Sequence, residues 1–76
     1  MALIHTWYCQ SQKNNLHAFC LLRSPYKTSV KKKIMELSDG HGFLKWEIGK
    51  LNDKQIKEFE ENNFDYDTLY EGETIQ

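Results

Sequence analysis

The chain has 76 residues, of which 39% are hydrophobic and 28% charged, and its formal net charge is −1. A chain of this length leaves little room for a deep catalytic cavity beside a core. Its apolar content favours folding, and we expect one domain over residues 1–76. It has no run of about 18 apolar residues and no signal-peptide pattern at its start, so we expect a cytoplasmic protein without membrane contact.

The first two segments rich in β-branched and aromatic side chains are Leu3 to Gln10 and Leu16 to Arg23, with a polar run of five residues between them. This pattern predicts a β-hairpin. A turn centred between Asn14 and Asn15 would place Cys9 opposite Cys20, Trp7 opposite Leu22 and Tyr8 opposite Leu21. One face would then carry Trp7, Cys9, Cys20 and Leu22, and the other Ile4, Tyr8, Phe19 and Leu21.

A first helix should follow the break at Ser24 and Pro25, with Thr28 or Ser29 as its N-cap. Its apolar stripe at i, i+4 and i+7 consists of Val30, Ile34 and Leu37. Gly40 should end it by taking the left-handed position after the last turn.

The next segment, Phe43 to Leu51, alternates apolar and polar residues and predicts a third strand rather than a helix. Asn52 and Gln55 have the spacing of a capping box, which predicts a second helix with Ile56 and Phe59 as its apolar stripe. We expect it to end at Asn62 and Asn63, with one more helical turn in 65–71 and frayed residues at 72–76.

These elements predict a small α+β domain in the order ββαβα. It should have a mainly antiparallel, three-stranded sheet with two helices packed on one face. Both faces of the hairpin are apolar, so the second face should be partly covered by the tail or by a partner. We expect modest stability for a domain of this size, and formation of a homodimer would be one way to increase it.

The charges are distributed unevenly along the chain. Up to Lys50 there are eight basic and three acidic residues, whereas from Leu51 onward there are two basic and eight acidic ones. After Lys57 the acidic residues alternate with Phe59, Phe64, Tyr66 and Tyr70. An acidic and aromatic stretch beside a basic half indicates electrostatically guided association with another macromolecule.

The basic half concentrates its charge around the start of the first helix, where cations oppose the helix dipole. Cations at this position are unfavourable for the helix, and an unfavourable local feature can mark a functional site. A phosphate or carboxylate group could bind at this helix start. A solvated lysine face is the simpler interpretation and the one we favour. The candidate anion-binding residues are Arg23, Lys27, Thr28, Ser29, Lys31, Lys32 and Lys33.

The acidic tail supplies the candidate partner-binding surface, because carboxylates among aromatic rings can imitate nucleic-acid phosphates or dock on a basic groove. Two alternatives remain open: the rings pack on the sheet while the carboxylates provide solubility, or the tail covers the lysine patch. The candidate residues are Glu60, Glu61, Asp65, Tyr66, Asp67, Tyr70 and Glu71.

Catalytic and metal-binding patterns are missing from the sequence. Cys9 and Cys20 lack the spacing of a zinc site and, in a reducing compartment, should be buried free thiols. No phosphate loop, HExxH or GxSxG motif occurs. We therefore expect no enzyme, no cofactor and no metal.

The sequence thus favours a non-enzymatic protein-binding module, a small acidic inhibitor or adaptor that docks on a basic site of a larger protein. Inhibitors of nucleic-acid enzymes from phages or mobile elements are a natural class by analogy alone. The alternative is a nucleic-acid-binding domain that uses the lysine-rich helix start.

Overall fold

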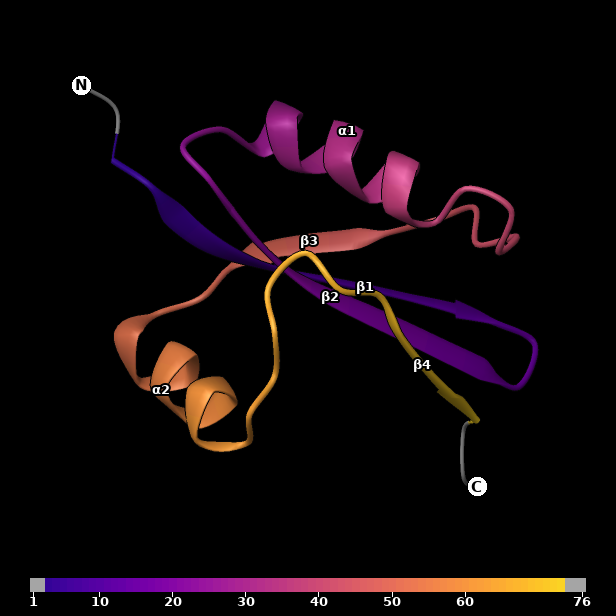
Figure 1. The fold of residues 1–76 in the computed structure, drawn as a ribbon. Helices are drawn as coiled ribbons and strands as arrows, with labels where there is room; N and C mark the ends of the chain where they lie inside the picture. The colour runs from indigo at the N-terminus through magenta and orange to yellow at the C-terminus, as the bar shows by residue number, and fades with distance from the viewer. Residues whose placement is uncertain (1–2, 74–76) are drawn as a thin grey trace.

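The computed structural model describes residues 3–73, which form a four-stranded antiparallel sheet with a helix on each face (Figure 1). Strand order in the sheet is β3-β1-β2-β4. Within the described residues, no helix has the length and apolar character needed to cross a membrane. The elements are β1 (His5–Lys13), β2 (Leu16–Ser24), α1 (Lys27–Leu37), β3 (Glu47–Lys50), α2 (Asp53–Glu61) and β4 (Tyr70–Glu73).

The predicted α+β class with an antiparallel sheet is confirmed, but the strand count and the element order were wrong. A fourth strand follows α2, because Tyr70 pairs with Phe19 and Glu73 with Leu16 at the outer side of β2. The helical turn predicted for 65–71 does not form, since Asp67 has a φ of 58° and so cannot continue a right-handed helix. Of the residues predicted to fray, Gly72 and Glu73 belong to β4, and 74–76 lie outside the described residues.

The two helices lie on opposite faces of the sheet and not on one face, which corrects the predicted packing (Figure 1). α1 covers the face that carries Trp7, Cys9, Cys20 and Leu22. α2 lies on the other face, where the ring of Phe59 stacks on that of Tyr8 at 5.5 Å between centroids. The tail after α2 then crosses this second face toward the edge of β2.

The hairpin has the predicted register, with Cys9 opposite Cys20, Trp7 opposite Leu22 and Tyr8 opposite Leu21. Asn14 takes a φ of 53°, which suits the tight two-residue turns that join antiparallel strands. The turn uses only Asn14 and Asn15, so β1 continues to Lys13, beyond the end at Gln10 that the apolar pattern indicated, whereas β2 begins at Leu16 as predicted.

The core lies between α1 and the sheet. It consists of Trp7, Cys9, Cys20, Leu22, Val30 and Ile34, with Leu37, Trp46, Ile48 and Leu69 packed against it. The stripe predicted for the first helix therefore faces the sheet. Its N-cap was predicted wrongly, because α1 begins at Lys27 after Tyr26, with no side-chain cap. Ser24 Oγ instead accepts from Tyr26 N at 3.3 Å, which turns the chain before the helix.

The capping box of α2 is confirmed. Asn52 Oδ1 accepts a hydrogen bond from Gln55 N at 2.9 Å, and Gln55 Oε1 accepts one from Asn52 N at 3.0 Å. Ile56 and Phe59 are only half-buried, and α2 has no fully buried residue. Its position against the sheet therefore depends on a few side chains.

We predict that Cys9 and Cys20 react with thiol reagents only after unfolding. Both thiols are free and buried. Burial, reinforced by the charge of Cys20, raises the pKa of Cys9 to about 12. Burial and then the charge of Asp67 raise the pKa of Cys20 to about 11. Because the thiolate is the nucleophile, the protonated thiols should not react at pH 8.

Titration with an aromatic disulfide reagent should find no fast-reacting thiol in the native protein and two in denaturant. A thiol that reacts rapidly in the native protein would contradict this prediction, as would a Cys9–Cys20 bridge that survives mild reductant.

Candidate functional site

Five aromatic rings form a cluster on the sheet face that carries α2. Phe19 of β2 lies at its centre, with ring centroids 5.1 Å from Tyr70, 5.2 Å from Phe64 and 5.7 Å from Tyr8. Phe59 of α2 lies 6.4 Å from Phe19 and 5.6 Å from Phe64. The rings come from β1, β2, α2, the following loop and β4, so the cluster anchors the acidic tail to the sheet.

Backbone contacts fix the loop between α2 and β4. Phe64 N donates to Phe59 O at 3.3 Å, and Asp67 N donates to Leu21 O at 2.9 Å. Tyr70 Oη accepts a hydrogen bond from Asp65 N at 2.9 Å. The loop thus has defined contacts at both ends, and the side chains of Asp65 and Asp67 are exposed on it.

The candidate partner-binding residues fall into two groups. Three make contacts within the chain. The Tyr66 ring lies 5.5 Å from the Arg23 guanidinium, Tyr70 belongs to the aromatic cluster, and Glu71 Oε1 lies 2.6 Å from His41 Nδ1. The other four are exposed at the end of α2 and on the loop, and we call them the acidic surface: Glu60, Glu61, Asp65 and Asp67.

The acidic surface has no ion pair within residues 3–73. Its carboxylates are therefore available to cations of another molecule. The charge of Asp67 helps to raise the pKa of Cys20, so the Asp67 carboxylate lies close to this strand residue.

The candidate anion-binding residues are divided by the fold. Lys27, Lys31 and Lys32 are exposed on α1, on the sheet face opposite α2. Lys33 Nζ donates to Arg23 O at 3.2 Å, whereas the Arg23 guanidinium lies over the tail residue Tyr66. Thr28 and Ser29 do not cap the helix. The tail thus reaches Arg23, but no ion pair within the described residues joins it to the lysines of α1.

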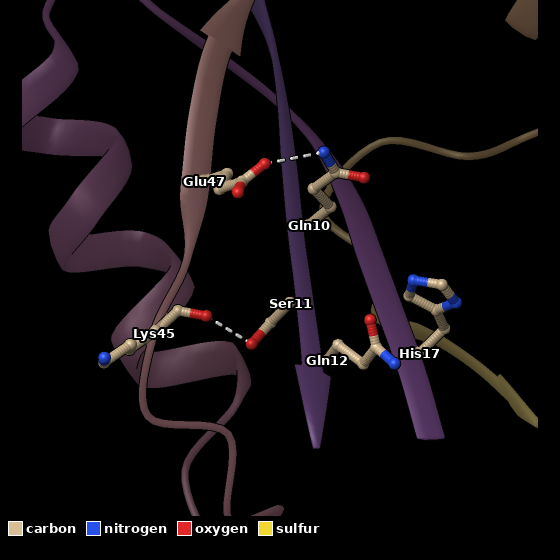
Figure 2. Close-up of a pocket in the computed structure, with 6 residues that line it drawn as sticks. All are labelled: Gln10, Ser11, Gln12, His17, Lys45 and Glu47. Carbon is tan, nitrogen blue, oxygen red and sulfur yellow. Dashed lines mark hydrogen bonds between the residues drawn. The ribbon is translucent and has the colours of Figure 1, made fainter. Parts of the chain in front are cut away.

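A polar hollow of about 250 Å³ was missed by the sequence analysis. It forms beside the first residue of β3, where β1 continues beyond its pairing with β3, and the Ser11 hydroxyl donates there to the carbonyl of Lys45 (Figure 2). Gln10 Nε2 donates to Glu47 Oε2 at 3.0 Å. The sequence feature that could have indicated this hollow is the pair of polar residues Gln10 and Gln12, which lie on the same face of β1. The lining residues are Gln10, Ser11, Gln12, His17, Lys45 and Glu47.

The donors and acceptors of this hollow can bind a polar group, but they form no arrangement with an activated nucleophile. Its hydroxyl, that of Ser11, already donates to a backbone carbonyl. Within residues 3–73, no three His, Cys, Asp or Glu side chains lie close enough together to hold a metal ion.

Comparison with known proteins places no relative beside this chain. No family model, curated protein or solved structure matches it.

Proposed function

We propose that this protein is a non-enzymatic protein-binding module that docks its acidic surface on a basic site of a larger protein. One observation carries the proposal: the four carboxylates of the acidic surface are exposed and have no ion pair within residues 3–73. They lie on a loop and a helix end held by the aromatic cluster.

The distribution of charge supports such a role. The exposed lysines of α1 and the two glutamates that end α2 belong to helices on opposite faces of the sheet, so part of the positive charge is separated from part of the negative charge (Figure 1). A field of this kind orients the protein before contact and raises the association rate with a basic partner. A loop that is already ordered also loses less conformational entropy on binding.

An inhibitor or adaptor is the form of this function that fits a domain of 76 residues. Exposed carboxylates can occupy a basic groove in place of nucleic-acid phosphates. By analogy alone, the protein would then belong to the inhibitors of nucleic-acid enzymes.

A nucleic-acid-binding domain is the second candidate, and one observation favours it. Lys27, Lys31 and Lys32 are exposed on one helix, which has no acidic residue in its first turn. Phosphates would be attracted to that helix. The acidic surface repels them from the rest of the molecule.

We predict that neutralising the acidic surface weakens binding to the protein partner about thirtyfold, if each carboxylate contributes about 0.5 kcal/mol. The variant is Glu60→Gln, Glu61→Gln, Asp65→Asn and Asp67→Asn, and its melting temperature should stay close to that of the wild type. A pull-down from the native host with mass spectrometry identifies the partner, and stopped-flow mixing then measures the rates. The association rate should account for most of the loss.

The matched control removes charge from the other side of the molecule through Lys31→Gln and Lys32→Gln, which should leave partner binding unchanged. Three results together would favour the nucleic-acid-binding candidate over the protein-binding module. The wild type would bind DNA or RNA at micromolar affinity, the lysine variant would lose that binding, and the variant with a neutralised acidic surface would still bind the protein partner.

A further inference from the structure

The sheet has two open edges. β3 pairs only with β1, and β4 pairs only with β2. Within residues 3–73 no other strand pairs with the outer side of either one. The backbone groups on an open edge can pair with a strand from another chain, and many proteins bind extended peptides in this way.

The two edges differ in charge. β4 carries the exposed residues Glu71 and Glu73. At β3, by contrast, Glu47 is flanked by Lys45 and Lys50, and all three are exposed. An extended segment with basic side chains is therefore attracted to β4 and not to β3.

His41 contacts β4 at Glu71, with 2.6 Å between His41 Nδ1 and Glu71 Oε1. Within the described residues, Glu73 has no ion pair, so the edge remains negative.

The two faces of β4 offer different contacts. Glu71 lies opposite Ala18 and Glu73 opposite Leu16, which places both carboxylates on the α1 side of the sheet. Tyr70 and Gly72 lie on the α2 side. A Cβ added at Gly72 would meet no atom within 4 Å, so there is open space at this position of β4. An apolar side chain of an added strand can fill that space.

A second copy of this chain is a poor occupant of the β4 edge. When two identical strands pair antiparallel about a two-fold axis, residues that face each other lie on the same side of the sheet. Glu71 or Glu73 of one copy would then face a glutamate of the other, which is destabilising.

We propose that an extended segment of the protein partner, with alternating basic and apolar side chains, adds to the sheet as a fifth strand beside β4. Its basic side chains lie against Glu71 and Glu73, and its apolar side chains cover Gly72 and Tyr70. This inference rests on the proposed function and specifies how the partner binds.

The first test uses a blocked octapeptide of alternating lysine and valine as the probe, with the full chain labelled for amide NMR. We expect slower hydrogen exchange at amides of Tyr70–Glu73 and chemical-shift changes centred there. A lysine–proline peptide has the same charge but cannot form a regular ladder, so it should bind about tenfold more weakly. A glutamate–valine peptide should not protect β4.

The second test removes the charge of the edge. The double variant Glu71→Gln and Glu73→Gln should weaken binding of the lysine–valine peptide about tenfold. The matched control, Asp53→Asn and Glu58→Gln on α2, loses the same charge away from β4 and should change binding less than twofold. Both pairs of residues are exposed, so both variants should fold.

Three results would overturn strand addition at β4: equal binding of the lysine–valine and lysine–proline peptides, protection at Glu47–Lys50 in place of β4, or protection of β4 in the protein alone as its concentration rises. The last result would assign the edge to a second copy.

Measurements on the partner complex separate this inference from the proposed function. If neutralising the acidic surface abolishes the complex but the wild-type complex does not protect β4, the strand addition is wrong and the proposed function stands. If the complex protects β4 and neutralising the acidic surface has no effect, the acidic-surface proposal is wrong and the strand addition stands.

Discussion

Replacing Ile34 by alanine should lower the free energy of unfolding by about 2 to 4 kcal/mol. Ile34 is 1% exposed and lies on the face of α1 that packs on the sheet. Its truncation removes buried methyl and methylene groups and leaves a cavity among Cys20, Leu22 and Val30, whose packing cannot close completely. Urea unfolding followed by tryptophan fluorescence measures the change.

The control for this prediction is Lys32→Ala, on the exposed side of the same helix. It should change the free energy of unfolding by less than about 0.5 kcal/mol. Similar losses for the two variants would mean that α1 is absent or rotated about its axis.

The substitution Phe19→Ala should lower the free energy of unfolding by about 2 to 3 kcal/mol. This loss is at or just below the lower end of the range for fully buried phenylalanines, because the Phe19 ring is only half-buried. Its larger effect should be local. Phe19 contacts rings from four other segments, and α2 has no fully buried residue of its own. Without Phe19, amides of α2 and of the loop to β4 should exchange faster than those of β1 and α1.

Hydrogen exchange on Phe19→Ala measures this local effect, with Tyr26→Ala as the control. Tyr26 is 59% exposed and makes no ring contact within residues 3–73, so its loss should change the free energy of unfolding by less than about 0.5 kcal/mol. Uniform acceleration over the whole chain would contradict the anchoring role of Phe19. If the acidic surface binds as proposed, Phe19→Ala should also weaken partner binding without changing any charge.

Several features of the fold could be predicted because they depend on neighbours in the sequence. The register that places Cys9 opposite Cys20 follows from the position of a two-residue turn. The capping box of Asn52 and Gln55 involves residues three positions apart. The stripe of Val30 and Ile34 follows from helical periodicity, although the pattern did not indicate that α1 begins at Lys27.

The candidate site was predicted only in part for the same reason. The acidic character of the tail is evident from composition. The contacts of Tyr66 with Arg23 and of Glu71 with His41 join segments far apart in the sequence, and no local pattern indicates them. The polar hollow likewise joins three strands and a loop.

The sequence by itself determined the hairpin, the two helices and the separation of charge along the chain. Only the tertiary structure decided that α2 lies on the face opposite α1 and that Tyr70–Glu73 is a strand. An apolar stripe such as Ile56 and Phe59 requires a covered side, but it does not select which face of the sheet provides it. The segment of β4 has no strand pattern of its own. It is extended because the open side of β2 offers backbone partners and Phe19 offers a ring for Tyr70 to stack on.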